Sequence, residues 1–334
     1  MDLRTYFLLA FLTLTGCLVY AQPSISENAY VSQLNLSGGF PEKLLSTRSV
    51  VFHSHTFTEA ELNTIQDYFQ RTGIDAVAYF PFDILTAGKD AATGFQTFLT
   101  KREITNLVFA EKRDGGFRLT ITEFKSGDGK VVEANQPAWS ASNGVLTDLL
   151  KNLNRNALAS LQRKNLLINQ YPEMDLSIDV IRGKRNEFYA VDMKVDLVAV
   201  PKFGIDSLDV QLERIFETHF PFAYKMVDPG VSERDMRKQG MLYTLCFMHA
   251  RANVVRELLG YPMRQSESAF VSITYPGDQQ QAKTIPGTRP VFKVYFKHID
   301  SGNVFLGTKW DADLTWQQAL INNIRAMKAE LRLN

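Results

Sequence analysis

His53 and His55 form the only His-x-His pair in this 334-residue chain, and their spacing could suit a metal ion. Residues two apart on a strand point to the same side, so both imidazoles could reach one metal. A zinc site needs a third protein ligand, and the neighbouring sequence offers none. The pattern therefore favours an exposed strand end, with His53 and His55 as the candidates should a metal bind.

A second candidate is the acidic segment Asp311-Ala312-Asp313, which has Asp300 and Asn303 nearby. Together these residues could offer oxygen ligands to calcium, but they lack the dense spacing of an EF-hand loop. Carboxylates are also favourable near helix N-termini. The segment therefore favours a capping role, with Asp313 as the cap of the last helix and Asp311 in the turn before it.

The usual catalytic spacings are missing from the sequence. It contains no Gly-x-Ser-x-Gly, no phosphate-binding Gly-x4-Gly-Lys-Ser/Thr, no His-Glu-x-x-His, no Cys-x-x-Cys and no Gly-x-Gly-x-x-Gly. Cys246 lies among apolar residues and is expected to be a buried, inert thiol. We predict no catalytic residue and no cofactor. A hydrolase with a site between two halves of the chain is the alternative.

The N-terminus predicts export. A short segment with one basic residue precedes an apolar run over residues 6–14, which is too short to span a membrane. Ala21 stands at a suitable signal-peptidase position, so residues 1–21 are predicted to be a signal peptide. Alternatively, Leu14-Thr15-Gly16-Cys17 resembles a lipobox, and Cys17 would carry a lipid anchor. Both interpretations indicate the periplasm or outer membrane of a Gram-negative bacterium.

Composition narrows the class of protein further. Hydrophobic residues make up 45% of the chain and charged residues 22%, which is typical of a globular protein. The 37 basic and 36 acidic residues nearly cancel, which argues against a dedicated nucleic-acid binder. No later stretch approaches the ~20 apolar residues of a membrane helix, so no membrane span is predicted.

A sequence pattern occurs twice. Phe117-Arg118-Leu119-Thr120-Ile121 and Phe292-Lys293-Val294-Tyr295-Phe296 are each followed by a Ser-Gly turn, a Trp-x-Ala segment and an apolar helix. Upstream, Val50 aligns with Leu197 without gaps for about 30 positions. The recurrence predicts an internal duplication, in which Trp139 and Trp310 are equivalent core residues.

Each copy is predicted to be an α/β (α+β) domain with the order β-α-β-α-β-β-α and a mixed sheet of about four strands. The first repeat covers residues 44–160, a linker 161–193 and the second repeat 194–334. A capping box at Thr58 and Glu61 and a terminating Gly73 bound the first helix. Further expected elements are central strands over 76–80 and 223–227, a third strand over 104–111 or 269–275, and helices over 91–102 and 232–260.

The second copy carries additions that the first lacks. Residues 276–290 are rich in Gln, Gly and Pro and predict a flexible loop. A long loop in one copy is a reasonable place for specialised binding, so Gln279, Gln280 and Lys283 are candidate partner-binding residues. Trp316 aligns with Val145 of the first copy, and we expect it to be partly exposed and to join this surface.

The segment Val198-Ala199-Val200-Pro201-Lys202-Phe203, followed by a helix and the strand Phe222-Ala223-Tyr224-Lys225-Met226-Val227-Asp228, resembles the TolB N-terminal and CsgG-type periplasmic domains. Those domains begin with a strand close to Val-Ala-Val-x-Pro-Phe and share the element order above. The resemblance implies a non-catalytic assembly module of the Gram-negative envelope, and it assigns no functional residue. We therefore predict an envelope protein with a protein-binding or assembly role, whose partner is another envelope protein.

Overall fold

The computed structural model describes residues 30–125, 130–174, 176–264, 266–277 and 279–333. The expected signal peptide, Cys17 and the predicted turn over 126–129 lie outside the described residues. The described chain is a mixed α/β protein, as predicted, with two larger mixed sheets and a separate two-stranded sheet.

The first sheet has the strand order β2-β1-β3-β4-β5. Strand β1 is parallel to both of its neighbours, whereas β3, β4 and β5 are successively antiparallel. The strands are β1 Arg48–His53, β2 Asp75–Pro81, β3 Ile104–Arg113, β4 Gly116–Glu123 and β5 Ala138–Asn143.

The helices of this half are α2 Glu59–Thr72, α3 Phe82–Leu85, α4 Lys89–Lys101 and α5 Leu146–Ser160, after a short 3-10 helix at Val31–Gln33. Helix α2 begins and ends as the sequence predicts. Thr58 and Glu61 form the reciprocal capping box, and Gly73 adopts a left-handed conformation with φ of 103°. Glycine is favoured there because it has no Cβ.

The second sheet has the order β6-β13-β12-β9-β7-β8. Its strand β7 is parallel to β8 and β9, and β9, β12 and β13 are successively antiparallel, so the core order matches the first sheet. The strands are β6 Arg185–Asn186, β7 Leu197–Pro201, β8 Tyr224–Val227, β9 Met241–Arg251, β12 Pro290–His298 and β13 Val304–Phe305.

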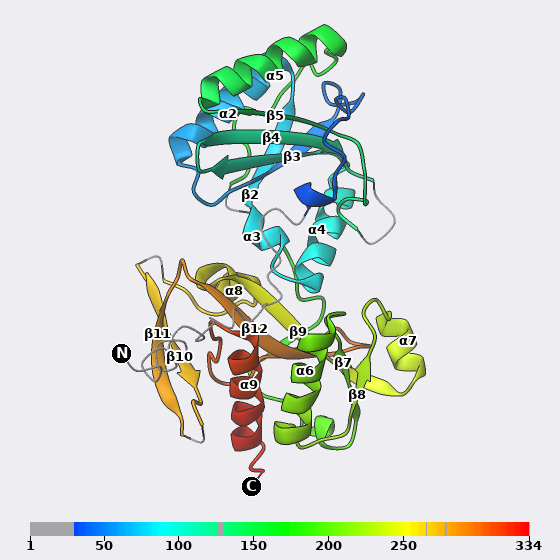
Figure 1. Ribbon diagram of the computed structural model, residues 1–334, viewed down its shortest axis with the longest axis vertical. Coiled ribbons are helices and arrows are strands. Elements are labelled where there is room, and N and C mark those ends of the chain that lie inside the picture. Colours follow the sequence, from blue (N-terminus) through cyan, green and yellow to red (C-terminus); the bar gives the residue numbers. More distant parts are fainter. Residues whose placement is uncertain (1–29, 126–129, 175, 265, 278, 334) are drawn as a thin grey trace, which may run out of the picture.

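The helices of this half are α6 Asp206–His219, α7 Glu233–Lys238, α8 Ala252–Leu258 and α9 Trp316–Glu330, with a 3-10 helix at Val191–Lys194. Strands β10 Ala269–Thr274 and β11 Gln281–Pro286 pair only with each other. In Figure 1 this hairpin stands beside the second sheet, on the side away from α7.

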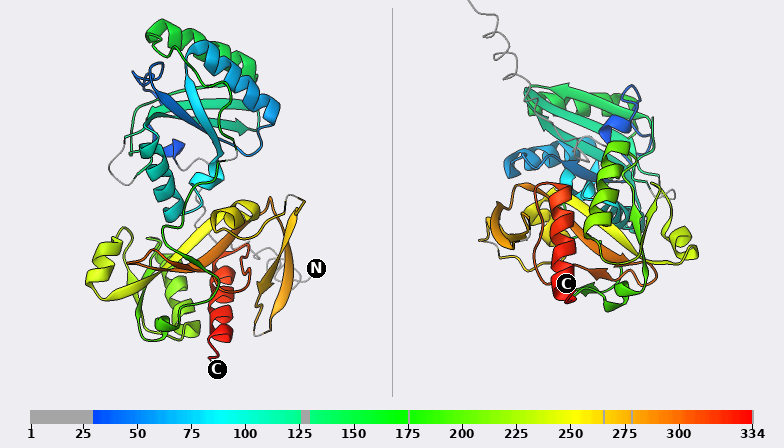
Figure 2. Two further views of the ribbon diagram at one scale, coloured as in Figure 1. Left: turned by 180° about the vertical axis from the view of Figure 1, so that it is seen from behind. Right: turned by 60° about the horizontal axis from the view of Figure 1, so that its bottom comes forward.

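The elements stack in layers (Figures 1 and 2). Helices α2 and α5 cover the outer face of the first sheet, and α6 and α9 cover the outer face of the second. Helices α3, α4 and α8 lie between the two sheets. One buried cluster accordingly contains Phe52 and Phe109 of the first sheet together with Val255 of α8 and Tyr295 of the second sheet. The two sheets therefore share part of their apolar core.

The predicted helix over 232–260 is wrong. The structure places a short helix, a long strand and another short helix there, and β9 is the third strand of the second sheet. Met241 and Leu245 are four apart, which fits a helix, but both are also buried strand positions flanking Tyr243. Pairing of β9 with β7 and β12 decides the outcome.

The predicted third strand over 269–275 is a strand, but it belongs to the separate hairpin. The predicted loop over 276–290 contains β11 and is therefore not open throughout. The predicted strands over 76–80 and 223–227 are present as β2 and β8. Their predicted central position is wrong, because both lie at sheet edges. Each sheet exceeds the predicted four strands, with five in the first and six in the second.

The first residues of the closing helices α5 and α9 differ by one position from the predicted alignment of the two halves. Helices α5 and α9 each have 15 residues and start 170 positions apart. Buried Leu146, Leu149 and Leu150 of α5 then correspond to buried Trp316, Ala319 and Leu320 of α9. When the two helices are compared from their first residues, Leu146, not Val145, takes the place of Trp316.

The expected equivalence of Trp139 and Trp310 is also wrong. Trp139 lies in β5 opposite Ile121 and stacks on Phe40 with 4.4 Å between ring centroids. The residue opposite the corresponding Phe296 is Phe305, in β13. Trp310 lies outside the strands and packs edge-on against Tyr261. The second half has a longer connection here, so its tryptophan leaves the sheet.

Candidate functional site

A cavity of about 490 Å³ lies between the two sheets. Its walls come from the start of α4, the segments after β7 and β8, helix α7, and strands β9 and β12. Ligands of α/β proteins commonly bind beyond the carboxyl ends of parallel strands, which is where β7 and β8 deliver Phe203 and Pro229. The cavity is the candidate site because it combines this position with an apolar wall and a polar end.

The apolar wall contains Phe203, Ile205, Val231, Met236 and Phe247. Phe203 is held by a hydrogen bond from its backbone N to Asp209 Oδ1 (2.7 Å), and its ring lies 5.2 Å from that of Phe247. Ile205 is 49% exposed although it lines the cavity. The packed rings of Phe203 and Phe247 therefore form the wall, and the Ile205 side chain leaves part of its apolar surface exposed to water.

The polar end is an ion-pair cluster that joins the two halves. Lys297 of β12 donates to Asp90 of α4 and lies 2.7 Å from Glu233 of α7. Tyr295 donates its hydroxyl to Asp90 Oδ2 (2.7 Å). Cys246 is the cross-strand neighbour of Tyr295. These groups satisfy one another, so the cluster fixes geometry without leaving a free carboxylate among its members.

The protonation states of these groups argue against nucleophilic chemistry. Burial, reinforced by Asp90, raises the pKa of the Cys246 thiol well above its usual value. Burial lowers the pKa of Lys297, but the negative charge of its neighbours outweighs burial and raises the pKa overall. Lys297 is therefore a charged ion-pair partner, and Cys246 is a protonated thiol, which is a poor nucleophile.

His249 also borders the cavity. Burial lowers the pKa of its imidazole, which lies parallel to the Phe292 ring at 3.9 Å between centroids. Its backbone N donates to Ala87 O (2.7 Å), another contact between the halves. The ring is held flat against an apolar partner, and among the described residues no carboxylate hydrogen-bonds to it to orient it as a base. The arrangement suits binding better than proton transfer.

The predicted histidine pair is not brought together as a metal site. Strand β1 ends at His53, so His55 lies in the following turn and does not share its strand face. His53 is buried, its Nδ1 contacts Ser54 O (3.0 Å), and burial lowers its pKa. Over the described part of the chain, no group of three His, Cys, Asp or Glu side chains is arranged to hold a metal.

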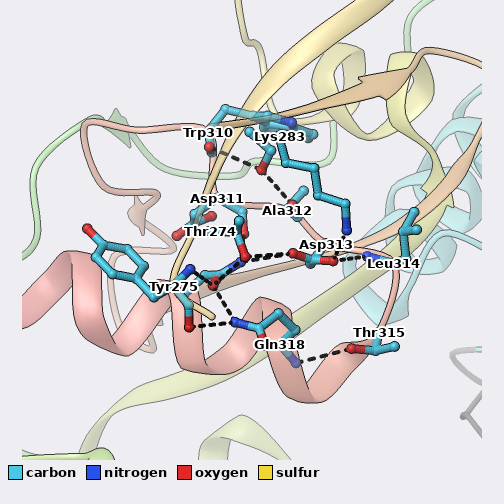
Figure 3. A network of polar contacts seen from close by, with 12 residues as sticks. Thr274, Tyr275, Lys283, Trp310, Asp311, Ala312, Asp313, Leu314, Thr315 and Gln318 are labelled. Atoms are coloured by element: carbon cyan, nitrogen blue, oxygen red, sulfur yellow. Dashed lines mark hydrogen bonds and ion pairs between the residues drawn. The ribbon is translucent and has the colours of Figure 1, made fainter. Parts of the chain in front are cut away.

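Figure 3 shows where the predicted partner-binding residue Lys283 lies. Its Nζ is 2.8 Å from Asp313 Oδ1, and Thr274 donates to Asp313 Oδ2 at 3.0 Å. Asn322 of α9 accepts a hydrogen bond from the backbone N of Tyr275 (2.8 Å). The network ties the β10–β11 hairpin to α9, so Lys283 has a structural role.

A second buried pair lies beside this network. Lys293 of β12 is completely buried and lies 2.5 Å from Asp311 Oδ1, while Asn323 donates to Asp311 Oδ2 (3.2 Å). Burial lowers the pKa of Lys293 and raises that of Asp311, against the effect of their pairing. Asp311 lies in the segment before α9, as expected, but the predicted capping role of Asp313 is wrong. Thr315 caps α9 instead, accepting from Gln318 N.

The remaining predicted partner-binding residues differ in their exposure. Trp316 is 0% exposed and packs against Phe203, so its predicted exposure is wrong. Its ring nevertheless supports the cavity wall from behind. Gln279 and Gln280 are exposed, and Gln280 Oε1 accepts from Lys309 Nζ (2.6 Å). The structure therefore does not bring Gln279, Gln280 and Lys283 to one surface with Trp316.

Sequence reasoning missed the residues that join the halves. Arg251 of β9 forms a two-pronged ion pair with Asp83 of α3, at 2.5 and 3.0 Å, with both side chains largely buried. Asp90 and Lys297 are 207 positions apart. No spacing rule links residues this distant, so only the fold could reveal the cavity.

Comparisons of the chain with protein-family models and with curated proteins found no match. Among the helices described, none is both long and apolar enough to cross a membrane.

Proposed function

We propose that this chain is an exported, non-catalytic binding protein of the cell envelope, and that the cavity between its sheets holds an apolar part of a partner protein. One observation carries the proposal. The cavity presents an open apolar wall, while Asp90, Glu233, Tyr295 and Lys297 at its polar end bond to one another. Such a site supplies burial and orientation but no activated nucleophile.

Ile205 provides further support. It occupies the N-cap position of α6 and makes no capping hydrogen bond with its side chain, whereas Thr58 caps the corresponding helix α2. Isoleucine is a poor N-cap, and replacing a good cap costs about 1 kcal/mol. An exposed isoleucine at a position that favours threonine is understandable if its side chain contacts a partner. Local rules are most often broken at functional sites.

We further infer that the two halves are tandem copies of one α/β unit. Helices α2 and α6 each have 14 residues and start 147 positions apart, in agreement with the ungapped sequence alignment. The matching order of β2-β1-β3-β4 and β8-β7-β9-β12 supports the same inference. The shared apolar cluster indicates that the copies act together.

The proposed location is the periplasm or the outer membrane of a Gram-negative bacterium. Residues 1–21 would be removed on export, or Cys17 would carry lipid. The resemblance to TolB N-terminal and CsgG-type domains supports an assembly role with an envelope protein as partner. Mass spectrometry of the mature N-terminus distinguishes simple cleavage from lipidation.

Site-specific photocrosslinking tests the function. A photoreactive residue at position 205 should capture an envelope protein in intact cells, because it lies on the open wall. The same residue at Val210, which is exposed on α6 but does not line the cavity, is the matched control. Pro229→Arg on the cavity rim should abolish the crosslink while leaving the unfolding midpoint unchanged.

Equal capture at positions 205 and 210 would contradict the proposal. A panel of esterase, phosphatase and glycosidase substrates tests the alternative of a hydrolase. An activity that Pro229→Arg removes would establish that alternative instead.

A further inference from the structure

The segment that follows α5 exposes two adjacent leucines at the end of the first sheet where β1 and β2 begin. Leu166 and Leu167 are each 92% exposed, and Tyr171 is 86% exposed. Burying a leucine side chain contributes roughly 1.5–3 kcal/mol. Two neighbouring leucines in water are therefore a considerable loss unless something covers them.

The backbone around these leucines is firmly held. Asn165 donates to Gly73 O (2.9 Å), and Asn169 N donates to Asp75 Oδ1 (2.9 Å). Gln66 of α2 donates to Asn169 O (2.7 Å). The segment is thus pinned on both sides of Leu166 and Leu167, and the fold presents the two side chains outward.

Basic side chains surround the exposed leucines. A groove of about 630 Å³ beside Leu167 is lined by Arg48, Lys101 and Arg102. Arg163 and Lys164, both exposed, precede the leucines and are separated from them by Asn165.

Two of the described carboxylates, Asp75 and Glu173, line the groove. Asp75 accepts from Asn169 N, and Glu173 pairs with Arg102 at 2.7 Å. The surface therefore carries an excess of positive charge next to an apolar tip.

We propose that this tip, defined as Arg163, Lys164, Leu166, Leu167 and Tyr171, binds the surface of an anionic phospholipid membrane. The leucines enter the boundary between headgroups and acyl chains, and the basic groove receives lipid phosphate. This combination of apolar side chains with flanking cations is what interfacial membrane binding requires. The inference is independent of the cavity and its partner.

Charge favours a membrane over a protein as the occupant. A cation near an anionic bilayer contributes about 1 kcal/mol. Arg163 and Lys164 of the tip, with Arg48, Lys101 and Arg102 of the groove, outnumber the two lining carboxylates by three. Two adjacent leucines that project into solvent suit a fluid interface, which needs no shape complementarity.

Vesicle co-sedimentation tests the proposal. The protein is purified after export as the Cys17→Ser variant, so that no lipid anchor contributes. It should bind vesicles containing phosphatidylglycerol and phosphatidylcholine, and should not bind vesicles of phosphatidylcholine alone. Leu166→Ser/Leu167→Ser should weaken binding at least about tenfold, as should Arg163→Gln/Lys164→Gln, since each cation contributes about 1 kcal/mol.

The matched control is Val210→Ser/Val271→Ser, which removes two exposed apolar side chains elsewhere and should leave binding unchanged. Leu167→Trp offers a test without loss of function, because the added fluorescence should shift to the blue on contact with anionic vesicles. Absence of binding, equal binding to both vesicle types, undiminished binding by the serine variant, or an unshifted tryptophan would each overturn the proposal.

Discussion

Arg118 of β4 and Lys293 of β12 each follow the phenylalanine that opens the repeated pattern, yet their surroundings differ. Arg118 is partly exposed and pairs with Glu111 on the neighbouring strand at 2.7 Å, and Glu111 also pairs with Arg113. Lys293 is wholly buried and pairs with Asp311, which lies in the connection to α9. The residue after the first phenylalanine therefore joins a partly exposed cluster around the buried Glu111 in one half, and a fully buried pair in the other.

The closing helices show the same contrast. Leu153 of α5 is a buried apolar residue, whereas its counterpart Asn323 in α9 donates to Val294 O and Asp311 Oδ2. At position 153, the first half thus holds its closing helix by apolar packing alone. The second half also uses buried polar groups, which link α9 to the sheet and to the β10–β11 hairpin. The second half tolerates these buried polar groups because most of their polar atoms have partners, although the buried Asn323 Oδ1 has none among the described residues.

The largest expected effect comes from breaking the buried pair. Lys293→Met should lower the free energy of unfolding by about 3–5 kcal/mol, because it leaves the Asp311 carboxylate buried without a cation. Arg118→Met should lower it by about 1 kcal/mol or less, since the pair is partly exposed and Glu111 keeps Arg113. Urea unfolding followed by circular dichroism measures both.

The double variant Lys293→Met/Asp311→Leu is the control for this comparison. Replacing both charges by apolar groups is often neutral or stabilising, so its unfolding free energy should return close to that of the wild type. Similar losses for Lys293→Met and Arg118→Met would show that the two cations are not in different environments.

The next largest difference in unfolding free energy is expected at Leu153 of α5 and the matching Asn323 of α9. Leu153→Ala should cost about 2–5 kcal/mol through the cavity it leaves. Asn323→Ala should cost about 1–3 kcal/mol, because it removes the hydrogen bonds to Val294 O and Asp311. Thermal unfolding of the two variants checks the order, and a more damaging Asn323→Ala would reverse our interpretation of the two helices.

The helix N-termini should respond in opposite directions. Thr58→Ala removes the capping box of α2 and should cost about 1 kcal/mol. Ile205→Thr adds a capping side chain to α6 and should stabilise the protein by up to a similar amount, while weakening the crosslink to the partner. A loss of stability in Ile205→Thr would mean that Ile205 is needed for packing instead.

The smallest expected effect is a pH dependence shared by both halves. Burial lowers the pKa values of His53 and His249, so the unfolded state binds protons more readily below its own pKa of about 6.5. The free energy of unfolding should fall as the pH drops through and below this value, by less than ~1.4 kcal/mol per pH unit for each residue. His53→Gln and His249→Gln should each flatten the profile; an unaltered slope in the double variant would exclude these two groups as its cause.

Elements with local signals were predictable from sequence. Thr58, Glu61 and Gly73 bound α2 because caps act within a single turn. Helices α2 and α6 have the same length and start 147 positions apart, which is the spacing of the predicted ungapped alignment. In contrast, β9 was mistaken for part of a helix because Met241 and Leu245 satisfy both periodicities, and its partner β12 lies about 40 residues further along the chain.

Side-chain environment was less accessible. Asp313 was predicted to be a helix cap and Asp311 a turn residue because aspartate is common before helices, and nothing nearby in sequence showed that Lys283 and Lys293 would pair with them. The exposure of Leu166 and Leu167 was likewise not predictable, because they lie in a linker whose burial depends on distant residues.

The sequence by itself determined the α/β class, the first helix of each half and the recurrence of the hairpin pattern, because these depend on hydrophobic periodicity and on residues within a few positions of one another. Only the tertiary structure decided which strand is central, which lysine is buried and where a cavity opens between the sheets. Those features depend on contacts between residues as far apart as Asp90 and Lys297, whose proximity is a property of the folded chain.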